Sequence, residues 1–144
     1  MIFTGIQASG KTTFREMNFP ELVHINLDTL RTRNREDRLL DECVEQGRPF
    51  VVDNTDPTRE SRRKYIGKAK AHGYRVIGYY FRSSIAECLG RNRERTGKAR
   101  VPDAAIFSTH GRLELPSYEE GFDELYYVRI GADGFVTDKW DEKR

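Results

Sequence analysis

The segment Gly5–Thr12 has the residue types and the spacing that bind a phosphate chain. Its sequence, GIQASGKT, matches the pattern G-x-x-x-x-G-K-[ST] without a mismatch. Glycines allow backbone conformations in which successive N–H groups face a polyphosphate at a helix N-terminus. We expect Lys11 to reach the β- and γ-phosphates and the Thr12 hydroxyl to bind Mg²⁺. The alternative is a glycine-rich turn with an exposed lysine. The predicted nucleotide-binding residues here are Gly5, Ser9, Gly10, Lys11, Thr12 and Thr13, although Thr13 is also an ordinary residue of the following helix.

Asp53 ends an apolar segment, and two interpretations of it stay open. A carboxylate after the strand at 50–52 is typical of the second nucleotide-binding motif, in which it holds Mg²⁺ directly or through water. Equally, Asp53 can start the turn at 53–56 and cap the next helix. Asp56 is expected to be a helix cap, because Pro57 follows it and suits the first helical position.

Asp28 follows the second apolar segment and is the candidate acceptor-side residue. The carboxyl ends of parallel strands line one crevice, so Asp28 should share a cleft with the phosphate loop. Arg31 lies three residues further on, and a helical turn would place both side chains on one face. A carboxylate that accepts a hydroxyl proton, beside an arginine that holds an anion, suits phosphoryl transfer. The alternative is an N-cap at Asp28 and a surface arginine.

Basic residues gather at the end of the helix predicted for 84–95. Arg91 and Arg95 are four residues apart and share a helix face. A mobile lid at about 84–100 would let these arginines close over ATP and neutralise the transferring phosphoryl group. A solvated basic helix end is the alternative. For the basic stretch at 59–70 we favour a solvated face over a nucleic-acid groove.

The elements that must position these residues alternate between strands and helices. Strands are expected at 1–6, 23–27, 49–52, 74–81 and 125–130, and helices at 11–18, 36–46, 57–72, 84–95 and 102–109. After a turn at 131–134, residues 135–140 either form a hairpin or fold over the sheet. This alternation predicts an α/β fold of the P-loop NTPase type. The expected architecture is a three-layer sandwich with a mostly parallel sheet of about five strands, in one domain at 1–144.

Composition excludes several classes of protein. The 144 residues are 37% hydrophobic and 11% aromatic, which argues against disorder. Two cysteines, Cys43 and Cys88, are too few for a disulfide scaffold or a Cys-rich zinc module. We find no membrane-spanning run and no secretory signal, so a cytoplasmic location is expected. The 18 arginines against 7 lysines suggest phosphate-bearing partners or a genome that favours arginine, and no stable protein partner can be inferred.

Taken together, these segments resemble the kinase domain of 5′-hydroxyl polynucleotide kinases. The resemblance covers residues 1 to about 130 in the family's order. Its segments are the phosphate loop, NLDTLR at 26–31, VVDNTDP at 51–57 with Arg62 and Tyr65 after it, the Arg-Asn-x-x-Arg end of 88–95, and PSYEEGF at 116–122. The last segments are the most specific, because ordinary P-loop kinases need not share them.

The resemblance implies ATP-dependent transfer of the γ-phosphoryl group to the 5′-OH end of DNA or RNA. Asp28 matches the family's general base, and Arg31 its ligand for the acceptor's neighbouring phosphate. Arg91 and Arg95 match the lid arginines. The predicted catalytic set is Lys11, Asp28, Arg31 and Arg95. Lys11 and Thr12 match the family's ATP and Mg²⁺ contacts, and the predicted metal contacts are Thr12 and, from its place after the strand at 50–52, Asp53. Two alternatives remain: a kinase of a small metabolite or nucleotide sugar, as in zeta-toxin-like kinases, and an ATP-binding module without chemistry.

Overall fold

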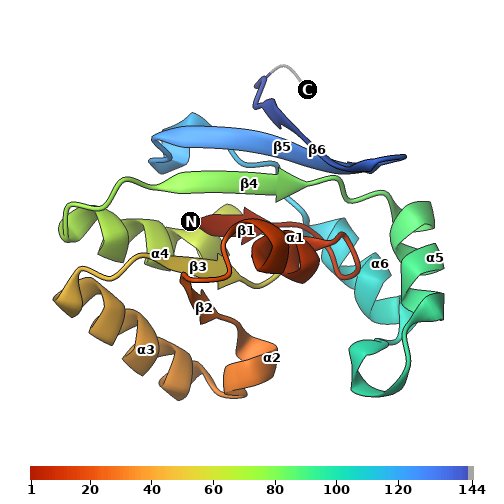
Figure 1. The fold of residues 1–144 in the computed structure, drawn as a ribbon, viewed down its shortest axis with the longest axis horizontal. Helices are drawn as coiled ribbons and strands as arrows, with labels where there is room; N and C mark the ends of the chain where they lie inside the picture. Colours follow the sequence, from red (N-terminus) through yellow and green to blue (C-terminus); the bar gives the residue numbers. More distant parts are fainter. Residues whose placement is uncertain (143–144) are drawn as a thin grey trace.

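The computed structural model describes residues 1–142, which fold around one six-stranded sheet (Figure 1). The strands are β1 (Ile2–Thr4), β2 (Val23–Ile25), β3 (Phe50–Asp53), β4 (Ile77–Phe81), β5 (Glu124–Gly131) and β6 (Gly134–Lys139). The helices are α1 (Lys11–Asn18), α2 (Leu27–Leu30), α3 (Arg33–Gln46), α4 (Arg59–Ala71), α5 (Ile85–Glu94) and α6 (Asp103–Arg112), with short 3₁₀ turns η1 (Gly97–Ala99) and η2 (Tyr118–Glu120). The strand order is β2-β3-β1-β4-β5-β6.

The first five strands are parallel and β6 alone is antiparallel. The predicted three-layer α/β sandwich is therefore confirmed, with a sixth strand added by the hairpin that was one of two expectations for 135–140. The phosphate loop follows β1, which lies between β3 and β4 in the middle of the sheet. This central position brings the ends of the neighbouring strands close to the loop.

Alternating side chains give the sheet two buried faces. On one face, Ile2 belongs to a cluster with Leu40 of α3 and Ile66 of α4. On the other, the neighbouring Phe3 packs against Phe14 of α1, with ring centroids 5.9 Å apart. Because successive strand residues point to opposite faces, one short apolar strand can anchor both helical layers.

The β5–β6 hairpin covers the outer side of β4. The turn expected at 131–134 is confirmed, since Gly131 pairs with Gly134. Directly after β6, Trp140 is 6% exposed, and its backbone N–H donates to Leu125 O at 3.0 Å. Its ring meets the Tyr80 ring edge-on at a centroid distance of 5.4 Å and lies 6.4 Å from that of Tyr127. The hairpin is thus tied to the sheet by an aromatic cluster.

Some element boundaries differ from those expected, and side-chain caps explain two of them. β2 ends at Ile25 because Asn26 caps α2, its side chain accepting from Thr29 N at 3.1 Å. The expected cap at Asp56, with Pro57 as the first helical residue, is wrong: Thr58 and Ser61 form a capping box, and α4 begins at Arg59. Among residues 1–142, no helix is long and apolar enough to cross a membrane.

Candidate active site

The phosphate loop is shaped by glycines at its two ends. Gly10 has a φ of 97°, a left-handed conformation that favours glycine, and caps α1. A Cβ atom there would also lie 3.0 Å from Phe135. At Gly5 a Cβ atom would lie 2.8 Å from Ser9 Oγ. Both glycines therefore let the loop close tightly at the N-terminus of α1, the geometry in which backbone N–H groups bind phosphate.

Lys11 is folded back into the loop. Its ammonium donates to Gly5 O and Ile6 O, both at 2.9 Å, and to Ser9 Oγ at 3.3 Å. Lys11 is 8% exposed, and burial lowers the pKa of its ammonium to about 8, although the Asp53 carboxylate opposes this. A desolvated cation held only by neutral oxygen atoms is ready to exchange them for phosphate oxygens.

The side chains of Thr12 and Asp53 form a hydrogen-bonded pair beside the loop. Thr12 Oγ1 donates to Asp53 Oδ2 at 2.7 Å, and His24 Nε2 lies 2.8 Å from the same oxygen. Burial raises the pKa of Asp53, but hydrogen bonds from His24 and Thr12 and the nearby Lys11 outweigh burial and hold it below its usual range. Asp53 is therefore a carboxylate at neutral pH.

This pair fits Mg²⁺ in chemistry and in number. Among the described residues, no group of three or more His, Cys, Asp or Glu side chains could hold a metal ion. Mg²⁺ needs no such cage, because it usually keeps several waters and takes one or two protein oxygen ligands together with substrate phosphates. Helix caps do not account for Asp53, since Thr58 caps α4.

Asp28 is the second residue of α2 and lines the same cleft as the phosphate loop. Its alternative role as an N-cap is excluded, because Asn26 occupies that position. Arg31 directly follows α2 with a left-handed φ of 73° and is exposed. It is not among the residues that line the cleft. The short helix unwinds at Arg31, so the two side chains do not share the cleft wall that their spacing suggested.

The predicted lid arginines lie in different places. Arg95 lines the cleft and donates to Ala99 O at 3.3 Å. Arg91 is not among the lining residues and donates instead to Ala8 O of the phosphate loop at 2.9 Å. Between them, Asn92 is fully buried and bonds both the N–H and the carbonyl of Val101. Arg91 thus supports the loop from outside, while Arg95 faces the nucleotide side.

One cleft of about 700 Å³ collects most of the predicted site. The sequence-predicted residues that line it are Gly10, Lys11, Thr12, Thr13, Asp28, Asp53 and Arg95. Gly5 and Ser9 are buried beneath it in the phosphate loop. The structure therefore brings Asp28, which was predicted for the acceptor side, to the same space as most residues that were predicted for the donor side.

Among the polar residues of this cleft that sequence reasoning missed are His24, Asn26 and Asn54. Each sits in or just after the end of β2 or β3, beside residues that were singled out. The signal that could have found them is position: polar side chains at the carboxyl ends of parallel strands face the crevice. Lys98 of η1, in the segment between α5 and α6, also lines the cleft.

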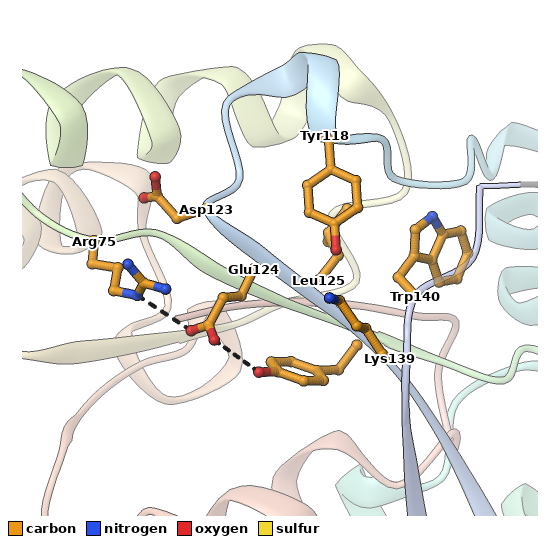
Figure 2. A pocket seen from close by; sticks show the side chains of 8 residues that line it. Arg75, Tyr118, Asp123, Glu124, Leu125, Lys139 and Trp140 are labelled. Atoms are coloured by element: carbon orange, nitrogen blue, oxygen red, sulfur yellow. Dashed lines mark hydrogen bonds and ion pairs between the residues drawn. The ribbon is translucent and has the colours of Figure 1, made fainter.

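A second cavity of about 580 Å³ lies at the opposite edge of the sheet, where β4 and β5 begin (Figure 2). Both of its carboxylates have hydrogen-bond partners. Arg75 Nε donates to Glu124 Oε2 at 3.3 Å, and Tyr126 OH donates to Glu124 Oε1 at 2.9 Å. Asp123 accepts from Lys70 and from Val76 N. This cavity is remote from the phosphate loop, and these pairs satisfy its carboxylates.

A match to a known protein family covers the phosphate loop and most of the chain. A family model described as an AAA domain matches residues 1–116, which is most of the chain. The chain belongs to this P-loop kinase domain family. Membership in the family implies nucleotide binding at the cleft.

Two curated relatives of this P-loop kinase domain have names that specify a substrate. The bifunctional polynucleotide phosphatase/kinase of Schizosaccharomyces pombe is 26% identical over 148 residues, covering 98% of this chain and 36% of that protein. A protein of Acanthamoeba polyphaga mimivirus, provisionally named in the same way, is 30% identical over 150 residues, covering 97% of this chain and 36% of its own length. The chain therefore spans about a third of the length of these relatives.

Solved structures share the fold at lower sequence identity. A gluconokinase from Sinorhizobium meliloti 1021 is similar with a TM-score of 0.61 at 20% identity, covering 89% of this chain and 80% of that one. Kti12 of Chaetomium thermophilum, solved with ADP-AlF3, has a TM-score of 0.64 at 16% identity, with coverage of 89% and 87%. These likenesses support the P-loop kinase architecture and no particular acceptor.

Proposed function

We propose that this chain is an ATP-dependent polynucleotide kinase that transfers the γ-phosphoryl group of ATP to the 5′-hydroxyl end of DNA or RNA. The observation that carries the proposal is the placement of the Asp28 carboxylate in the same cleft as Lys11 and Thr12. A domain that only binds nucleotide needs no carboxylate there. The names of the two curated relatives support a polynucleotide acceptor.

On the donor side, the phosphate loop holds the β- and γ-phosphates. Lys11 leaves the carbonyl oxygens of Gly5 and Ile6 and binds phosphate oxygens, where its charge offsets the negative charge of the transferring group. Mg²⁺, held through Thr12 and Asp53, would supply further charge neutralisation at the phosphates. Arg95 adds a cation from the lid side of the cleft.

On the acceptor side, Asp28 orients the attacking hydroxyl. In a loose phosphoryl transfer the nucleophile needs positioning more than early deprotonation, so a carboxylate suffices. Asp28 accepts a hydrogen bond from the hydroxyl and takes its proton late, as the new O–P bond forms. The proton therefore moves from the acceptor oxygen to a carboxylate oxygen while the ADP oxygen leaves.

Arg31 is proposed to bind the phosphate on the 3′ side of the terminal nucleoside. Among residues 1–142, the Arg31 side chain has no hydrogen bond or ion pair, and it lies just outside the cleft after α2. A terminal nucleoside inside the cleft would leave its 3′-phosphate at this rim. Guanidinium groups bind phosphate in a two-point geometry that lysine lacks.

A second candidate is a kinase of a small polyhydroxyl metabolite. The wall that α2 contributes to the cleft presents Asp28 and Thr29, which carry a carboxylate and a hydroxyl but no cation. Such a wall also suits a sugar hydroxyl. If the chain is a kinase of such a metabolite, Arg31 is an ordinary exposed residue.

The deciding experiment measures transfer of labelled phosphate from ATP to three acceptors. These are a 5′-OH oligonucleotide, the same oligonucleotide with a blocked 5′ end, and a panel of sugars and nucleosides. We expect most of the label in the 5′-OH oligonucleotide, little in the nucleosides, and none in the sugars or the blocked oligonucleotide. Equal label in both oligonucleotides, or none in either beside good turnover of a sugar, would support the small-molecule kinase instead. Cys43 and Cys88 are free and buried, which fits the cytoplasmic location that we propose for the activity.

A further inference from the structure

Asn54 joins the acceptor side of the cleft to a buried polar cluster. It follows Asp53 at the end of β3 and is half-buried. Asn54 Oδ1 accepts from the backbone N–H of Leu27 in α2 at 2.9 Å. Asn54 Nδ2 donates to Glu36 Oε2 at 2.9 Å and to Tyr65 OH at 3.3 Å. The amide orientation is dictated by its partners, because a backbone N–H only donates and a carboxylate only accepts.

The anchor of this connection is the Glu36 carboxylate, which is fully buried. Burial raises the pKa of Glu36, but hydrogen bonds from Tyr65, Lys64 and Asn54 outweigh burial and lower it overall. Tyr65 OH donates to Glu36 Oε1 at 2.8 Å, and Arg33 and Lys64 contact the same oxygen. A buried carboxylate with this many donors has a well-defined position, because moving it would break several hydrogen bonds that offset the cost of its burial.

The element that carries Asp28 has little stability of its own. α2 is four residues long, and isolated helices of that length do not form in water. Two amide side chains tie it to the end of β3: Asn26 Nδ2 donates to Asp53 O at 2.5 Å, and Asn54 accepts from Leu27 N. The position of Asp28 relative to Thr12 and Asp53 therefore depends on these two ties.

We propose that Asn54 is a positioning residue for the acceptor aspartate. Anchored by Glu36 and Tyr65, it fixes the backbone of α2 so that Asp28 meets the acceptor hydroxyl at the phosphate end of the cleft. This inference rests on the proposed function, since it assigns Asp28 to the acceptor. It predicts an effect on transfer that operates through Asp28 and leaves nucleotide binding largely intact.

The test is a double-mutant cycle between Asn54 and Asp28. Asn54→Ala is expected to lower kcat for the 5′-OH oligonucleotide about 10- to 100-fold, because small misplacements of a reacting group cost about that much. The Kd for ATP should change less than about threefold. In the Asp28→Asn background, Asn54→Ala should lower kcat by less than about threefold more, since the group that it positions is already disabled. Asn34→Ala is the matched control, because Asn34 is exposed on α3 and its side chain has no hydrogen bond among the described residues.

Tyr65→Phe is the second variant, used if the alanine variant does not fold. It keeps the ring and the Asn54 side chain but removes the hydroxyl that contacts Asn54 Nδ2 and Glu36 Oε1, so the same cycle with a smaller loss of kcat is expected. An equal fold-loss of kcat in both backgrounds would overturn the positioning role, and so would a change confined to the Kd for ATP. Full transfer to the oligonucleotide by Asp28→Asn alone would remove Asp28 from the acceptor site and would also overturn the positioning role. The proposed function fails separately, if the wild-type protein transfers no phosphate to the 5′-OH oligonucleotide.

Discussion

Lys11 occupies a resting position in which three oxygen atoms of its own loop compensate its charge. We expect Lys11→Ala to lower kcat by at least about 10²–10³, because a fixed cation acts most strongly as charge spreads over the γ-phosphoryl oxygens. Steady-state kinetics at saturating ATP measures this loss. Lys139→Ala on β6 is the control, since Lys139 is exposed and remote from the phosphate loop. A change only in the KM for ATP would contradict the assigned role.

Arg31 gives a prediction about which acceptors are preferred. A nucleoside 3′-phosphate should be a better acceptor than the bare nucleoside, and Arg31→Ala should narrow this gap by raising the KM for the phosphorylated acceptor. Arg31→Lys should restore the preference only in part. Arg35→Ala serves as the comparison, because Arg35 is an exposed arginine of α3 close in sequence. An unchanged ratio of kcat/KM values for the two acceptors would remove Arg31 from the acceptor site.

At the residue scale, the sequence predicted the site correctly where the spacing of residues determines the backbone conformation. The spacing of Gly5, Gly10 and Lys11 predicted a phosphate loop, and the structure has one. The relation between Asp28 and Arg31 was not predictable, because it depends on where a four-residue helix unwinds. Asn54 was missed for a similar reason: its role comes from partners on α2, α3 and α4 that lie far away in the sequence.

Among the elements, the segment between α5 and α6 depends on one buried amide. Asn92 Nδ2 donates to Val101 O at 2.7 Å, and Val101 N donates to Asn92 Oδ1 at 3.0 Å. Asn92→Ala leaves both backbone groups of the half-buried Val101 without their partner, at a cost of about 1–3 kcal/mol for each group that water does not reach. We expect faster hydrogen exchange at the Val101 amide and a higher KM for ATP, because Arg95 and Lys98 lie in this segment. Unchanged exchange at Val101 would show that the segment is held by other contacts. Asn34→Ala is again the matched asparagine control.

Element order was easier to predict than element ends. The alternation of apolar strands and amphipathic helices predicted the parallel sheet, and the apolar run at 74–81 predicted β4. The expected start of that strand at Tyr74 was too early, since Tyr74 instead donates its hydroxyl to Cys43 O and Arg48 O. Boundaries of this kind depend on tertiary hydrogen bonds, which no local pattern contains.

For the whole molecule, Asp56 makes stability depend on pH. Asp56 is 5% exposed, has a left-handed φ of 39°, and its Oδ2 is buried without a hydrogen-bond partner. Burial, with the nearby Glu36 carboxylate adding to it, raises the pKa of Asp56 from 3.8 to about 7. The folded state therefore favours the neutral acid, and its contribution to stability is lost as pH rises from about 4 to about 7. A pKa difference of this size between the unfolded and folded states corresponds to a change of about 4 kcal/mol in the free energy of unfolding.

We expect Asp56→Asn to raise the free energy of unfolding at pH 8 and to change it little near pH 4. Urea unfolding of both proteins, followed by circular dichroism, gives the difference directly. Asp41→Asn is a control, since Asp41 is an exposed aspartate paired with Lys68 on the surface. A difference between wild type and Asp56→Asn that is the same at both pH values would show that Asp56 does not titrate in this range.

The aromatic cluster around Trp140 gives this protein a built-in optical probe. Trp140 is the single tryptophan of the chain, and it is buried against the rings of Tyr80 and Tyr127. It lines the cavity at the edge of the sheet opposite the phosphate loop. Its fluorescence should therefore be blue-shifted in the native protein and excited in part by energy transfer from tyrosine. Nucleotide binding should change this fluorescence very little. Loss of that emission would report detachment of the C-terminal hairpin without any added label.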